Sequence, residues 1–204
     1  MANARAGRLT FELAAGGVGF TVDGSFSPAS GSLPKLDFTY TEHLADGDNV
    51  ATLVSDGNTV TVDADGDERV LSADDASRLE GGTKGFADLG IASWVENPRE
   101  DKQGDGTVVT GKVDVADLLQ DVVRLITQVN AKGDVKPLDD ATAKRLGALA
   151  QVSTIEVVIG GDGVPRSVDA DVGFGRAVPD ALVDALGPYA ASDLKVKVRF
   201  APQP

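Results

Sequence analysis

Cysteine is absent from this sequence, and aromatic residues make up only 5% of it. Without cysteine the chain has no disulfide bridge, no thiolate nucleophile and no cysteine-ligated metal. The cellular compartment stays open, because many exported proteins also lack cysteine. With so few aromatic rings, we expect a core built mainly from Val, Leu, Ile and Ala side chains.

Histidine is nearly absent as well, since His43 is the single one. A hydrolytic triad needs a nucleophile, a base and an orienting acid, and the sequence has no Gly-x-Ser-x-Gly motif. We therefore predict no catalytic residue and place His43 as an exposed residue near the end of a strand. An enzyme that uses His43 is one alternative interpretation.

Long apolar runs and positive charge are also scarce. No stretch approaches the roughly 20 apolar residues that a transmembrane helix needs. The first eight residues lack the apolar core of a signal peptide, and residues 1–6 are expected to be disordered or added for expression. The 32 acidic against 19 basic residues give a net charge of −13. Such a surface repels phosphate backbones, which excludes nucleic acid as a partner.

What the sequence does contain is a regular alternation of apolar and polar residues in its first third. Leu9, Phe11 and Leu13 alternate with Thr10 and Glu12, as in a strand with one buried face. Asp-Gly and Gly-Gly pairs separate such runs and favour two-residue hairpin turns. The predicted strands are residues 8–14, 18–27, 36–44, 49–55, 59–64 and 68–71.

The middle of the sequence changes to helical periodicity. Residues 72–81 predict a short helix and residues 85–98 a helical or irregular apolar stripe ended by Pro98, whereas residues 99–106 predict a solvated loop. A strand over 107–113 then leads into a helix over 114–129, capped by Asp114 and stopped by Gly133. The apolar side chains of that helix cover roughly 160° of its wheel, so it should lie flat on a wide apolar surface.

The last third predicts a helix over 139–151, a hairpin around residues 160–163, a short helix that starts near Pro179 and a final strand. Asp169 and Asp171 lie on the polar face of one late strand, and Lys195, Lys197 and Arg199 on that of the last. Opposite charges favour these two strands as antiparallel neighbours.

Carboxylates crowd between Asp63 and Glu68 in a way that suits calcium. The run lacks the spacing of an EF-hand, however, and Asp65-Gly66 is already explained as a hairpin turn. We predict no metal and no cofactor.

These elements predict one α+β domain over residues 1–204, a curved antiparallel sheet that holds several helices on its concave face. Two outcomes stay open for the layer between them. Either the side chains interlock to native density, or the sheet and helices enclose an apolar cavity suited to lipid tails.

The order of elements resembles the actinobacterial lipoproteins of the LppX/LprAFG family, in the wider LolA-like group of periplasmic lipid and lipoprotein carriers. The resemblance covers Arg8 to Phe200 and includes "LGIASWVENP", "DGTVVTGKVDVADLL" and "IEVVIGGDGVPRSVDADVGF". It implies a half-barrel over helices, a pocket for acyl chains, export to the cell envelope and a lipidated N-terminal cysteine. This sequence departs from that pattern because it contains no cysteine.

From these observations we expect a monomeric, non-enzymatic carrier that binds a lipid or acyl-chain ligand in an apolar cavity. The alternative is an extracytoplasmic structural or interaction domain with a filled core and an acidic partner-binding surface. The helix should contribute one cavity wall, through Leu118, Leu119, Val122, Val123 and Ile126. The sheet should contribute the other, through Phe20, Val22, Phe38, Tyr40, Ile155, Val157, Val168 and Val172. Phe86, Leu89 and Trp94 should flank the mouth.

Overall fold

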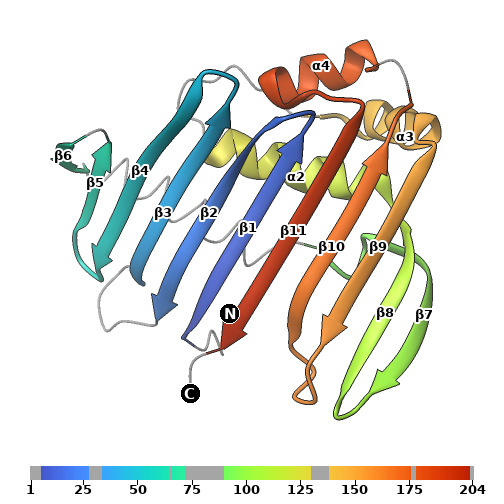
Figure 1. Cartoon of the computed structure of the whole chain (residues 1–204), viewed down its shortest axis with the longest axis horizontal. Coiled ribbons are helices and arrows are strands. Elements are labelled where there is room, and N and C mark those ends of the chain that lie inside the picture. Colours follow the sequence, from blue (N-terminus) through green and yellow to red (C-terminus); the bar gives the residue numbers. More distant parts are fainter. Residues whose placement is uncertain are drawn as a thin grey trace.

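The computed structural model of this protein describes residues 6–27, 34–64, 66–71, 90–129, 138–175 and 178–202. Its strands form one antiparallel sheet of eleven strands. The strand order is β6-β5-β4-β3-β2-β1-β11-β10-β9-β8-β7. The first and last strands of the chain therefore pair at its centre (Figure 1). The strands are β1 (Gly7–Ala15), β2 (Val18–Ser27), β3 (Lys35–Leu44), β4 (Gly47–Asp56), β5 (Val60–Ala64), β6 (Asp67–Val70), β7 (Val95–Gln103), β8 (Gly106–Val113), β9 (Val152–Ile159), β10 (Pro165–Gly173) and β11 (Asp193–Pro202).

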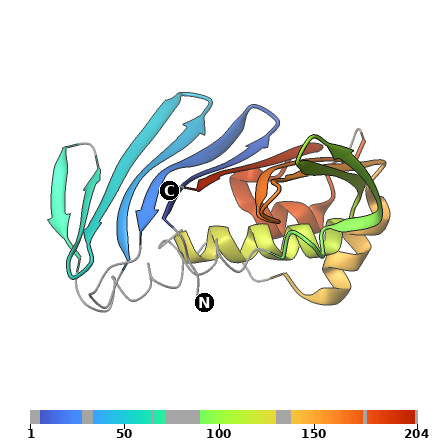
Figure 2. The same ribbon diagram turned by 90° about the horizontal axis from the view of Figure 1, so that it is seen from below.

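The helices of the described residues lie on one side of this sheet, which arches over them (Figure 2). They are α2 (Val115–Val129), α3 (Asp140–Leu149), α4 (Asp180–Leu186) and the 3-10 helix η1 (Gly187–Tyr189). The predicted α+β class, a curved antiparallel sheet with helices on its concave face, is confirmed. The predicted helix at residues 72–81 and the stop at Gly133 lie outside the described residues.

The start of α2 confirms the capping role predicted for Asp114. Its Oδ1 accepts hydrogen bonds from the backbone N–H groups of Ala116 at 3.0 Å and Asp117 at 3.1 Å. These two donors have no partner inside the helix, so the cap stabilises the first turn. Asp139 does the same for α3, where it accepts from the backbone N–H of Thr142.

The solvated loop predicted at residues 99–106 is wrong, because most of this segment lies in strand β7 and its hairpin with β8. Of the apolar stripe predicted over residues 85–98, residues 85–89 lie outside the described residues, a turn occupies Ile91–Trp94, and strand β7 begins at Val95. Pro98 sits at an irregularity in the β7–β8 register, and Asn97 has a φ of 51°. β7 is an edge strand, where proline is tolerated and exposed charges replace the apolar alternation that marks other strands.

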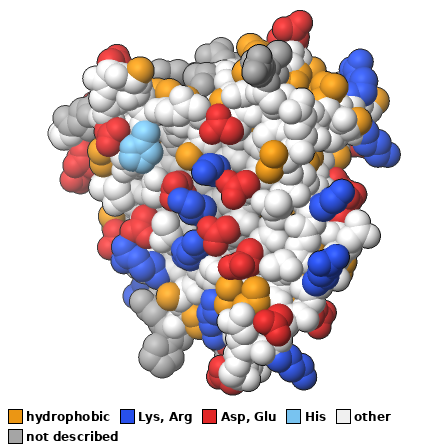
Figure 3. Space-filling view, turned by 45° about the vertical axis from the view of Figure 1, so that its right-hand side comes forward, with side chains coloured by type: hydrophobic (Ala, Val, Ile, Leu, Met, Phe, Trp, Pro, Cys, Tyr) orange, Lys and Arg blue, Asp and Glu red, His pale blue; other side chains and the backbone are white. Residues whose placement is uncertain are grey.

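The convex face of the sheet carries charges of both signs (Figure 3). Asp169 lies opposite Lys197 and Asp171 opposite Lys195, which confirms that β10 and β11 are antiparallel neighbours. Ion pairs join Arg199 to Asp169 at 2.8 Å and Lys195 to Asp171 at 3.8 Å, and Lys197 reaches Glu12 on β1 at 3.2 Å.

Candidate functional site: the concave face of the sheet

The core lies between the concave face and the helices, and the predicted wall residues converge there. Leu118, Leu119, Val122 and Val123 of α2 are at most 2% exposed. On the sheet, six predicted residues are buried in the same cluster, namely Phe20, Val22, Ile155, Val157, Val168 and Val172. Phe38 and Tyr40 are partly buried against it. The side chain of Ile126 lies outside the described residues.

Helix α2 covers only part of this face. Its 15 residues span about 22 Å, whereas eleven strands extend over about 48 Å. Strands β4, β5 and β6 pass beyond the end of α2 (Figures 1 and 2). The layer is therefore closed by α2 at the centre of the sheet, while the β4–β6 side is not covered by this helix.

The concave face still carries apolar side chains on the strands beyond the end of α2. Cross-strand register places Phe38 of β3 beside Leu53 of β4, and Leu53 beside Val62 of β5. All three side chains are partly buried, and we call them the outer wall. Two positions away on the same strand face, Leu36 of β3 and Val60 of β5 are buried. The outer wall continues the apolar surface begun by Phe20 and Val22.

A polar cluster interrupts this apolar face at its rim. Glu42 follows Leu36, Phe38 and Tyr40 at alternate positions of β3, so its side chain belongs to the same face. The Tyr189 hydroxyl donates to Glu42 Oε1 at 2.7 Å, and Asn49 Nδ2 donates to Oε2 at 3.2 Å. The Tyr40 and Tyr189 hydroxyl oxygens lie 3.4 Å apart.

Aromatic rings line the approach to this cluster. The Phe20 ring meets Tyr189 edge-on with centroids 5.5 Å apart and lies 5.8 Å from the Tyr40 ring. Burial raises the pKa of the Tyr189 hydroxyl well above its ordinary value, and its hydrogen bonds with Tyr40 and Glu42 raise it further. Burial raises the pKa of Tyr40 too. Both phenols therefore remain neutral donors at ordinary pH.

Trp94, predicted at the cavity mouth, is fully buried in the turn before β7. Its indole N–H donates to Asp121 Oδ2 on α2 at 2.9 Å, and the backbone N–H of Gly90 donates to the same oxygen at 2.8 Å. Asp121 thus fixes the 90–94 turn to α2. The other two predicted mouth residues, Phe86 and Leu89, lie outside the described residues.

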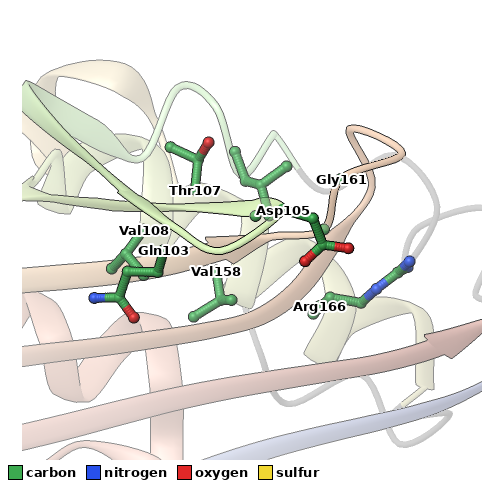
Figure 4. A pocket seen from close by; sticks show the side chains of 10 residues that line it. Gln103, Asp105, Thr107, Val108, Val158, Gly161 and Arg166 are labelled. Carbon is green, nitrogen blue, oxygen red and sulfur yellow. The ribbon is translucent and has the colours of Figure 1, made fainter.

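Two hollows among the described residues lie at strand ends. The larger has a volume of about 360 Å³ and lies between the β7–β8 and β9–β10 turns (Figure 4). Gln103, Asp105 and Arg166 contribute its polar side chains, and Arg166 is paired with Asp162 at 2.9 Å. The second, of about 110 Å³, lies between the ends of β2 and β3.

Within the described part of the chain, no three potential metal-ligating side chains gather. Asp63, in the carboxylate-rich run, accepts a hydrogen bond from the backbone N–H of Gly66 and so supports the β5–β6 turn. His43 is near the end of β3 on the convex face, where Nε2 contacts the Thr21 hydroxyl and Nδ1 contacts Asp48. No described helix has the length and apolar content to cross a membrane.

Comparison with solved structures gives a likeness in fold. No family model and no curated protein matches the sequence. The fold is similar to the crystal structure of LprF from Mycobacterium bovis, with a TM-score of 0.47 and 10% sequence identity over 97% of this chain and 84% of that one.

Proposed function

We propose that this protein is a non-enzymatic carrier that binds the hydrocarbon chain of an amphipathic lipid on its concave face, in the cell envelope. The observation that carries the proposal is the outer wall, Phe38, Leu53 and Val62, which extends the apolar face past α2. Burial of a chain on this surface stabilises the complex by about 0.8 kcal/mol per methylene. Affinity should therefore rise with chain length.

The predicted lining residues divide into two groups in this proposal. Phe38 of the outer wall and its neighbour Tyr40 are partly buried and would contact a bound chain directly. Phe20, Val22, Ile155, Val157, Val168 and Val172 are buried in the core around α2, so a chain reaches them only when α2 moves away from the sheet. Leu118, Leu119, Val122, Val123 and Ile126 would form the wall that moves. Phe86 and Leu89 would flank the mouth, with Trp94 as its anchor.

The first experiment is native mass spectrometry of the protein purified from a lipid-containing host, followed by lipid extraction. We expect a bound amphiphile, and we expect Leu53→Asp to lose it because a carboxylate on the outer wall would be desolvated by the chain. A matched control is Val54→Asp, which places the same charge on the next residue of β4 but on the exposed convex face. Repeated absence of bound lipid in the wild-type protein would contradict the proposal.

The closed layer beneath α2 favours a second candidate function, an interaction domain with a filled core. Leu118, Leu119 and Val122 are each only 1% exposed, as in a core without a ligand. With its net charge of −13, such a protein would present acidic surface to a basic partner. This interaction-domain function predicts that Leu53→Asp and Val54→Asp leave the host-purified protein equally free of lipid.

A further inference from the structure

Glu42 is a carboxylate on an otherwise apolar strand face. Its register neighbours are Phe20 on β2 and Asn49 on β4, and the positions before it on the same face hold Leu36, Phe38 and Tyr40. A charged group in such surroundings costs free energy unless it is hydrogen-bonded. Another apolar residue at this position would also fit the alternation of β3, so the carboxylate is the group on this strand face that a polar part of a ligand can contact.

The hydrogen bonds of Glu42 leave acceptor capacity on both oxygens. Tyr189 donates to Oε1 and Asn49 donates to Oε2. Because a carboxylate accepts about four hydrogen bonds, each oxygen can accept one more. Glu42 is partly exposed, so a ligand can approach these positions.

The surroundings of the carboxylate suit a cation. The chain has two tyrosines, and both lie here with their hydroxyls 3.4 Å apart. Phe20 packs against both rings. An ammonium group is attracted by a carboxylate and can donate to the phenol oxygens beside it, whereas a phosphate or carboxylate headgroup would be repelled by Glu42.

Glu42 also lies at the right distance from the outer wall. Phe38 precedes it by four residues on the same strand face, which corresponds to roughly 13 Å along β3. A ligand with its headgroup at Glu42 can therefore lay its hydrocarbon chain along Phe38, Leu53 and Val62. A charged rim beside an apolar wall is the arrangement that an amphiphile requires.

We infer that Glu42, flanked by Tyr40 and Tyr189, binds an ammonium group in the headgroup of the amphiphile whose chain lies on the outer wall. This inference rests on the proposed function and adds the class of headgroup to it. Glu42 accepts from the ammonium N–H groups, and the two phenol hydroxyls lie beside the cation. Anionic headgroups are selected against at this rim.

The experiment compares three ligands with the same chain, decylammonium, decyl glucoside and decyl phosphate, each below its micelle concentration and at neutral pH. Calorimetry in about 0.5 M salt screens the diffuse attraction of the acidic surface for cations. We expect decylammonium to bind about ten-fold more tightly than either of the other two. Glu42→Gln should abolish that preference.

The matched control is Glu12→Gln, which removes the same charge from the convex face of β1. It should keep the full preference for decylammonium. Equal affinity for the three ligands in the wild-type protein would overturn the headgroup inference but leave the proposed function intact, whereas no binding of any of them would overturn both. An equal loss of preference in Glu12→Gln and Glu42→Gln would show a surface-wide charge effect and also overturn the inference.

A second variant covers the case in which Glu42→Gln does not fold. Asn49 is exposed, so Asn49→Ala should fold, and it frees an acceptor position on Glu42 Oε2. We expect decylammonium to bind this variant about two-fold more tightly than it binds the wild-type protein. A loss of decylammonium affinity with unchanged decyl glucoside affinity would contradict direct binding at Glu42.

Discussion

Tyr189 and Glu42 are separated by 147 residues in the chain, yet the phenol hydroxyl of one donates to the carboxylate of the other at 2.7 Å. The contact joins η1, which follows α4, to strand β3. It fastens the segment after α4 to the rim of the concave face, next to the outer wall. The same hydrogen bond therefore contributes both to stability and to the candidate headgroup site.

Removal of this hydrogen bond should destabilise the protein. Tyr189→Phe keeps the ring against Phe20 but leaves Glu42 with Asn49 as its partner, and hydrogen bonds to charged groups contribute about 1.5 to 3 kcal/mol. Since Glu42 is partly exposed, we expect a loss of about 1 to 2 kcal/mol in the free energy of unfolding by urea. Tyr40→Phe, which removes only the 3.4 Å contact, should cost less. A larger effect of Tyr40→Phe would contradict the assigned network.

The two tyrosines should titrate only at unusually high pH in the folded protein. Burial raises the pKa of both hydroxyls above the ordinary value of 10.0. A raised folded-state pKa contributes stability that is fully present below pH 10 and is lost as the pH rises toward the folded-state values. Absorbance of tyrosinate should therefore appear at about pH 10 in the urea-unfolded protein but only at higher pH in the folded protein. Coincident titration curves would refute the buried placement.

Asp121→Ala should release the single tryptophan from its anchor. The variant removes the acceptor of the Trp94 indole N–H and of the Gly90 backbone N–H, and a buried donor without a partner costs about 1 to 3 kcal/mol. Because the chain has one tryptophan, its fluorescence reports on this turn alone. We expect a red-shifted emission and a lower urea midpoint. Asp117→Ala, a substitution on the same helix, should leave the emission unchanged.

The closed layer beneath α2 should resist larger side chains. Leu118→Trp or Val122→Trp inserts a ring where the side chains are 1% exposed, and overpacking of this kind costs about 1 to 3 kcal/mol. Leu53→Trp on the outer wall should change stability by less than about 0.5 kcal/mol while it lowers ligand uptake. If Leu118→Trp is tolerated without loss of stability, the layer is a hollow and not a closed core.

Acid should destabilise the fold through its capping carboxylates. The backbone N–H of Thr142 holds the pKa of Asp139 below 3.8, and those of Asn58 and Thr59 do the same for Asp56. A lowered folded-state pKa contributes stability that is present above pH 3.8 and lost as the pH falls through the folded-state value. The urea concentration at the unfolding midpoint should therefore decrease when the pH is lowered below about 4. Asp139→Asn, which can cap but cannot ionise there, should show a shallower fall.

Much of the sheet could be predicted because each strand with one buried face carries its own alternation. Arg8 to Ala14 and Val18 to Ser27 identify their strands without knowledge of their neighbours. β7 could not be found in this way, because an edge strand with exposed charges has no apolar alternation. Ten of the predicted wall residues lie buried in the core between α2 and the sheet, and their contact with a ligand stays a prediction. Leu53 and Val62 of the outer wall were not among the predicted residues. Glu42 and Tyr189 were missed, although Glu42 did give a signal, a carboxylate where the alternation of β3 expects an apolar residue.

The sequence by itself determined which residues face inward, where α2 begins at Asp114, and that charges on β10 and β11 match. These properties depend on local spacing and on hydrogen bonds within a few residues. The tertiary structure decided that β1 pairs with β11, that Trp94 meets Asp121 and that Tyr189 reaches Glu42. Such contacts depend on which strand lies beside which, and alternation is the same whatever the partner, so only the assembled sheet shows how far its apolar face extends past α2.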